Sequence, residues 1–152
     1  MDKDSKEEES FFDLSDEFGS NPAAEVEGVW SYLGETAKVK VARLGNLEAQ
    51  KAYRKIPKQV RDQIEKGNMG NKAAIQFLSK FLATHILKDW FGLSDGGKTL
   101  PAYDAEAGTE FLLKYRRFRD RIWEIAIDDD LYNVKEVEET AGNLSKRSSG
   151  SS

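Results

Sequence analysis

The first regular pattern along the chain is an alternation of apolar and polar positions on both sides of Gly34. Trp30 and Tyr32 lie before the glycine, Val39 and Val41 lie after it, and one residue separates the members of each pair. A period of two is typical of a strand with one buried face, and two such runs around a glycine predict a β-hairpin. Because an isolated hairpin is only marginally stable in water, we expect it to pack against other elements.

After the hairpin, the apolar positions recur every three or four residues, as in helices with one buried face. Short helices are predicted over residues 47–56 and 57–66, the second begun by a proline and closed by Gly67. The longest helix is predicted over residues 71–90, with Asn71 as its N-cap. Its apolar stripe comprises Ala74, Phe77, Leu78, Phe81, Leu82, His85, Ile86 and Trp90.

Glycines and a proline predict a loop over residues 91–103. Asp104 then caps a helical segment that runs to residue 127 and breaks near Arg116, and residues 131–140 form a last short helix. We therefore expect a mainly α fold, in which a small helical domain carries a short N-terminal β-hairpin.

Both ends of the chain lack this apolar periodicity. Residues 1–22 carry eight acidic side chains against two lysines, a charge of −6 in a chain whose total is −4. A segment with so little apolar surface does not offset the entropy lost on ordering. We expect a disordered acidic tail at 1–24, a folded domain at 25–141 and a disordered polar tail at 142–152. The acidic tail is either a solubilising extension or a docking motif for a basic, apolar partner, built on its three phenylalanines, Phe11, Phe12 and Phe18.

Composition limits the chemistry that is available to the chain. Cysteine is absent, which excludes disulfides, thiolate zinc sites and a cysteine nucleophile. The single histidine, His85, lies on an apolar stripe, where a core or boundary role is favoured over metal ligation. No apolar run reaches the roughly 20 residues of a membrane helix. We expect a soluble cytoplasmic protein that is not an enzyme and binds no cofactor.

Residues 92–99 match the phosphate-loop pattern G-x-x-x-x-G-K-[ST] letter for letter, with Lys98 as its lysine. The pattern binds phosphate only where a buried strand feeds the loop and a helix follows it. A helix is predicted before it, and no apolar helical run follows directly. We interpret the segment as a glycine-rich turn between two helices and expect no nucleotide binding.

The densest basic run, residues 114–121, interleaves Lys114 and four arginines with two aromatic residues. Arginines and aromatics together bind single-stranded nucleic acid through phosphate contacts and stacking. Here Tyr115 and Phe118 share the apolar face of the helix, which favours a core role for the rings and a solvated face for the arginines. The acidic balance of the chain also argues against nucleic acid as the partner.

The sequence resembles the tail assembly chaperones of long-tailed, siphovirus-like bacteriophages, over about residues 25–152. The acidic stretch before Glu25 has no counterpart in that resemblance. Four stretches carry the resemblance, in the order expected for that family. The first is KVKVARLGN at 38–46, and the second is ILKDWFGL at 86–93 with the turn and acid-capped helix at 95–108. The third is the helix and polar break at 111–132, and the fourth is the glutamate-rich segment at 137–152, which ends in serines.

The resemblance implies a protein of the host cytoplasm that binds the tape measure protein and keeps it soluble while the tail tube forms. Such a chaperone is not retained in the virion and is accompanied by a frameshift-extended form. Further partners that the resemblance suggests are this extended form, the tail tube protein and further copies of the chain. The competing hypothesis is a nucleic-acid-associated regulator of phage or host that uses the basic Lys114 to Arg121 face.

A chaperone of helical partners needs an apolar surface ringed by charge, on which an amphipathic helix can dock. The candidate partner-binding residues are aromatics of the hairpin and of the end of the long helix, with core packing as the competing explanation for each. They are Trp30, Tyr32, Trp90 and Phe91.

Overall fold

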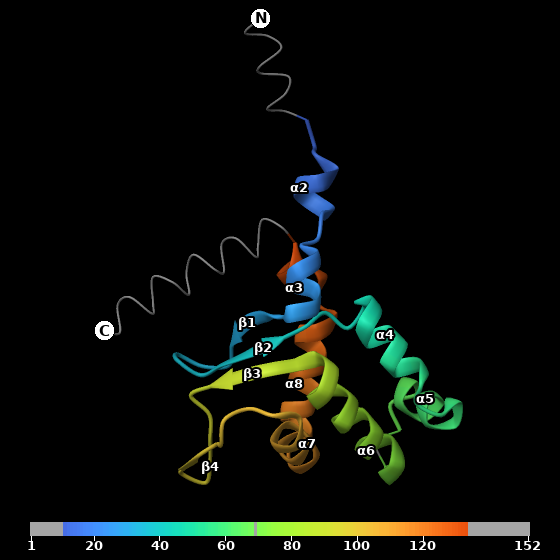
Figure 1. The fold of residues 1–152 in the computed structure, drawn as a ribbon, viewed down its shortest axis with the longest axis vertical. Coiled ribbons are helices and arrows are strands. Elements are labelled where there is room, and N and C mark those ends of the chain that lie inside the picture. The colour runs from blue at the N-terminus through green and yellow to red at the C-terminus, as the bar shows by residue number, and fades with distance from the viewer. Residues whose placement is uncertain (1–10, 69, 134–152) are drawn as a thin grey trace, which may run out of the picture.

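The computed structural model describes residues 11–68 and 70–133, which form helices packed around a small antiparallel sheet (Figure 1). Seven α-helices and five strands lie in these residues, so the expectation of a mainly α fold with only a hairpin is wrong, and the fold is mixed. The α-helices are α2 Leu14–Phe18, α3 Pro22–Glu27, α4 Leu47–Arg54, α5 Lys58–Glu65, α6 Lys72–Phe81, α7 Ala105–Lys114 and α8 Arg116–Ile127. A π-helical segment spans Leu82–Ile86 and a 3-10 turn spans Asp129–Tyr132. The strands are β1 Val29–Tyr32, β2 Lys38–Val41, β3 Leu87–Phe91, β4 Ser94–Asp95 and β5 Lys98–Thr99.

The main sheet has the order β1-β2-β3, with β2 in the centre and antiparallel to both neighbours. The predicted hairpin is confirmed, since β1 and β2 pair from Val29 opposite Val41 to Tyr32 opposite Lys38. The third strand, β3, was not expected. It supplies the packing partner that a two-stranded hairpin needs.

The predicted helix over residues 71–90 is corrected in its second half. α6 ends at Phe81, the π-helical segment follows, and the chain then becomes strand β3. The register places Val41 opposite Leu87 but Lys40 opposite Asp89, which leaves Lys88 as the extra residue of a bulge. The bulge lets Leu87 and Trp90 face the core together although they are three residues apart. This spacing of three residues between buried side chains is also typical of a helix, which is why the sequence pattern predicted one here.

Backbone groups freed at this change from helix to strand find new partners. The Tyr103 hydroxyl donates to the carbonyl of Ala83, and the Ala42 N–H donates to the carbonyl of Ile86 at 2.7 Å. Buried carbonyls without partners are costly, so these two bonds help to hold the junction in place.

Several predicted helix boundaries are confirmed. The side chains of Asn71 and Asp104 accept N–H bonds from Ala74 at 3.1 Å and Ala107 at 2.7 Å, as N-caps do. α7 and α8 are separated at Tyr115, next to the expected break. Of the helix predicted over 131–140, only residues 131–133 are described. Leu131 and Tyr132 belong to the 3-10 turn, and Asn133 follows it in extended conformation.

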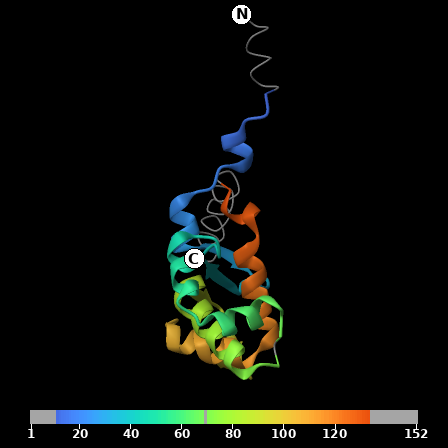
Figure 2. The same ribbon diagram turned by 90° about the vertical axis from the view of Figure 1, so that its right-hand side faces the viewer.

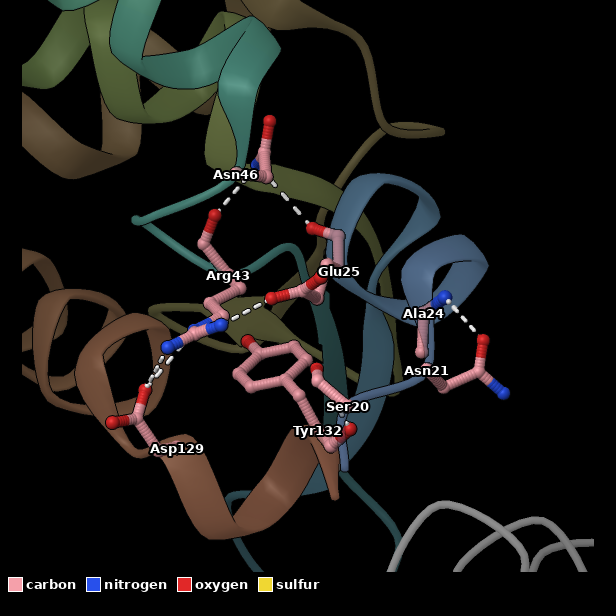
Figure 3. A network of polar contacts seen from close by, with 8 residues as sticks. All are labelled: Ser20, Asn21, Ala24, Glu25, Arg43, Asn46, Asp129 and Tyr132. Atoms are coloured by element: carbon pink, nitrogen blue, oxygen red, sulfur yellow. Dashed lines mark hydrogen bonds and ion pairs between the residues drawn. The ribbon is translucent and has the colours of Figure 1, made fainter. Parts of the chain in front are cut away.

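The acidic N-terminal segment departs from the disorder expected for residues 1–24, because residues 11–24 include α2 and the start of α3. Ser20 forms a β-bridge with Asn133, and the Asn21 N–H donates to the carbonyl of Tyr132 at 3.0 Å. Figure 3 shows the Arg43 guanidinium between the carboxylates of Glu25 and Asp129. The tail at 142–152 and the first ten residues lie outside the described residues.

The main hydrophobic core joins the sheet to the helices, and α8 lies against β2. A second, smaller cluster of buried residues comprises Ala24, Val29 and Tyr132. Trp90 is at the edge of the main core, 8% exposed, with its indole N–H donating to the carbonyl of Pro101 at 2.9 Å and its ring edge-to-face with Tyr103 and Phe111. Both ribbon views place α2 at one end of the molecule and α5, α6 and α7 at the other (Figures 1 and 2).

The two tryptophans of the sheet are expected to differ in their contribution to stability. Trp90→Ala removes a buried ring and should lower the free energy of unfolding by about 3–5 kcal/mol. Trp30→Ala removes a half-buried ring and should cost about 1 kcal/mol. Urea unfolding followed by circular dichroism measures both, and equal losses would contradict the assignment of the two rings to opposite faces.

Candidate functional site

The sheet has one face turned to the core and one turned away from it. Strand alternation sends Val39, Val41 and Trp90 inward, where they are buried. The opposite face carries half-buried or exposed side chains from all three strands, and we call it the outer sheet face. It comprises Trp30, Tyr32, Lys38, Lys40, Asp89 and Phe91.

Lys38 lies at the centre of this face, between two aromatic rings. Its Nζ is 4.7 Å from the centroid of the Trp30 ring and 5.3 Å from that of Phe91. Trp30 comes from β1 on one side of β2, and Phe91 comes from β3 on the other side, directly opposite Lys38. A cation over an aromatic ring is attracted by the electrons of the ring face, so these contacts fix the orientation of both rings.

The outer sheet face brings together three of the four candidate partner-binding residues. Trp30 and Tyr32 are half-buried, and Phe91 is 58% exposed. Trp90 is on the other side of the sheet, where its hydrogen bond and ring contacts make it a core residue. Lys38 and Lys40 were not among the candidates, although their alternation with two valines was the signal that could have found them.

A mainly apolar cavity of about 400 Å³ lies between α4, α5, α6, α8 and the turn after β2. Trp123 and Phe81 contribute rings to it, while Arg43 and Asp129 lie at its rim as the ion pair already described. Tyr53 also lines the cavity, and its hydroxyl donates a hydrogen bond to the Glu65 carboxylate at 3.3 Å. Burial raises the pKa of Tyr53 to about 12. The cavity thus offers an apolar recess whose charged groups already have partners.

The basic run at residues 114–121 differs from its predicted arrangement. Arg119 is buried, and its guanidinium donates to the carbonyl of Leu112 at 2.9 Å. Tyr115, which was predicted to lie in the core, is exposed, and its hydroxyl donates a hydrogen bond to the Asp95 carboxylate. The Lys114 ammonium donates to the same carboxylate at 2.7 Å. The hydrogen bond from Lys114 lowers the pKa of Asp95 below its ordinary value. Two more arginines pair with acids of the same helix, Arg116 with Asp120 and Arg121 with Glu124.

The phosphate-loop match is a turn of different construction from the one predicted. Strand β3 precedes it, and its glycines Gly96 and Gly97, with φ of 59° and 87°, join β4 to β5 as a tight hairpin. Only glycine adopts such angles without strain. Lys98 itself lies in strand β5, and a loop to α7 follows it where a phosphate loop has a helix. The predicted turn between two helices is therefore a hairpin between β3 and α7.

His85 lies on the π-helical segment beside the Phe81 ring, with centroids 5.8 Å apart. Burial lowers the pKa of His85 below its ordinary value. Within residues 11–68 and 70–133 the acidic and histidine side chains form no cluster that would hold a metal ion. No helix in the same residues has the length and apolarity that crossing a membrane requires.

In a comparison with families of known proteins, residues 44–143 match the family described as YdaY prophage protein. The matched segment is more than half of the chain and extends from α4 through β3 to α8, while β1 and β2 precede it. No curated protein and no solved structure matches the chain.

The contacts of Lys38 predict a measurable contribution to the order of the outer sheet face. Lys38→Gln removes the cation between the two rings and should lower the free energy of unfolding by about 0.5–1 kcal/mol. Lys40→Gln is the matched control on the same strand, and we expect it to change stability by less. Thermal and urea unfolding of the two variants test this, and an equal effect of both would show that the ring contacts of Lys38 contribute nothing.

Proposed function

The chain belongs to the YdaY prophage protein family, and from this premise we propose that it is a chaperone of phage tail assembly. In this proposal it binds the tape measure protein in the host cytoplasm, keeps it soluble while the tail tube forms, and does not remain in the virion. A frameshift-extended form would accompany it. The phage origin and the resemblance of four ordered sequence stretches to tail assembly chaperones support the proposal.

The single observation that carries the binding role is the outer sheet face. Trp30, Tyr32 and Phe91 form an aromatic surface on the side of the sheet away from the core. Large aromatic side chains are the commonest anchors of protein interfaces, because they bury much apolar area at little entropic cost. Lys38 and Lys40 add positive charge, which favours a helix with apolar anchors and acidic flanks over a basic one.

The proposed role is binding without catalysis and without a cofactor. A long helical partner that aggregates through its apolar stripe is kept soluble when that stripe is covered. The rigid backbone of a three-stranded sheet suits this purpose, since it holds the rings in place before the partner arrives and so reduces the ordering cost of binding.

The nucleic-acid hypothesis has less support than the chaperone hypothesis. Its footprint was the Lys114 to Arg121 face, where one arginine is buried and three other basic side chains are paired with acids. Paired charges release fewer counterions from a phosphate backbone. A gel shift with single-stranded DNA or RNA at low salt tests it directly, and we expect no shift.

Binding of the tape measure protein should depend on the outer sheet face. Co-expression with the tape measure protein of the same prophage, followed by affinity capture, measures both its soluble fraction and the complex. Trp30→Ala combined with Phe91→Ala removes two anchors and should weaken capture tenfold or more. Phe77→Ala is the matched control, because Phe77 is an exposed aromatic residue on α6.

Folding of each variant is checked by circular dichroism before the binding experiment. If the folded double variant captures and solubilises the tape measure protein as well as the unaltered chain does, the outer sheet face is not the binding site. If the unaltered chain captures none, the chaperone proposal itself is wrong.

A further inference from the structure

The segment of residues 11–18 carries four of the ten exposed large apolar side chains among the residues that the structure describes. Its four large apolar side chains have exposed fractions of 70% for Phe11, 66% for Phe12, 67% for Leu14 and 72% for Phe18. The rings of Phe12 and Phe18 meet edge-to-face with centroids 5.6 Å apart, so they form one patch. Exposed patches rimmed by charge mark interaction sites.

Contacts at the end of α2 hold this segment away from the sheet of its own chain. The Asn133 side-chain amide donates to the carbonyl of Glu17 at 2.8 Å, and the Ser20 hydroxyl donates to the carbonyl of Tyr132 at 3.2 Å. Tyr132 is itself fixed, because its buried hydroxyl donates to the carbonyl of Val41 at 2.9 Å. Figures 1 and 2 show α2 projecting from the end of the molecule, with α3 between it and the sheet. The segment therefore points away from the sheet of its own chain.

The charges of the segment complement those of the outer sheet face. Residues 11–18 also carry three acidic residues, Asp13 at the N-cap of α2 and Asp16 and Glu17 in its first turn. On the outer sheet face, Lys38 and Lys40 lie among the rings of Trp30, Tyr32 and Phe91, and the two lysines outnumber its single acidic residue, Asp89. An acidic aromatic segment and a basic aromatic face attract each other both by charge and by burial of apolar area.

We propose that residues 11–18 of one copy of the chain dock on the outer sheet face of a second copy. The two surfaces differ, so the contact is heterologous and continues from copy to copy unless a ring closes. The area is small, and we expect weak, concentration-dependent association. If the proposed function is correct, the segment also covers the partner-binding face until the tape measure protein displaces it.

The association is tested with the full chain alone, by sedimentation velocity over a series of concentrations. One variant carries Phe12→Ser and Phe18→Ser, which removes the docking rings. A second carries Lys38→Glu and Lys40→Glu, which reverses the charge of the face. Leu47→Ser is the control, because Leu47 is 74% exposed and lies outside both surfaces. We expect the unaltered chain and the control to associate, and each double variant to remain monomeric.

Mixing the two double variants gives the sharpest test. One retains an intact sheet face and the other an intact segment, so the mixture should form a one-to-one heterodimer and nothing larger. Because circular dichroism checks the fold of each variant, the absence of association is not a folding defect.

Three results would overturn the inference. These are an unaltered chain that stays monomeric at every concentration, a charge-reversed variant that still associates, and a mixture that gives no heterodimer. The tape measure protein takes no part in this experiment, so its failure is distinguishable from failure of the chaperone proposal.

Discussion

Burial of Val39 and Val41 in the central strand is the constraint on which the arrangement of the sheet depends. Both side chains are fully buried, and because a strand alternates, their burial directs Lys38 and Lys40 to the opposite face. Because β2 pairs with β1 on one side and with β3 on the other, its register also fixes the face of their side chains. Trp30 and Phe91 lie on the same face as the lysines, while Trp90 lies on the same face as the valines. A slip of one residue in β2 would place the lysines in the core, so the composition of the outer sheet face is enforced by the cost of burying charge.

Polar contacts attach both ends of the described chain to strand β2 and to the turn that follows it. The Tyr132 hydroxyl bonds the carbonyl of Val41, and Arg43, two residues further on, links Glu25 of α3 to Asp129 of the 3-10 turn. The hydrogen bond that Arg43 donates to the Glu25 carboxylate raises the pKa of Arg43 above its ordinary value, so this cation stays charged across the physiological range. The segment that carries the exposed phenylalanines is thereby attached to the sheet through a few polar contacts at its base (Figure 3). The segment therefore extends from one end of the molecule instead of packing on the sheet of its own chain.

The hairpin, the helix caps and the helix break at Tyr115 could be predicted from the sequence, because each depends on neighbours within a few residues. Strand β3 could not, since the π-helical segment and the bulge at Lys88 preserve a helix-like spacing of buried residues into the strand. Trp90 was consequently grouped with Phe91, although the two rings face opposite sides of the sheet. The burial of Arg119 could not be predicted from the sequence either. It depends on a hydrogen bond to the Leu112 carbonyl, which is seven residues away across the break between two helices.

If the outer sheet face binds the partner, the indole N–H signals of the three tryptophans report it most directly. Trp30 is on that face, Trp90 is in the core with its N–H bonded to Pro101, and Trp123 lines the cavity beside Arg43. Adding unlabelled tape measure protein to the ¹⁵N-labelled chain should shift or broaden the Trp30 signal well beyond any change at the other two. A change at Trp123 with the Trp30 signal unmoved would place binding at the cavity and contradict the account.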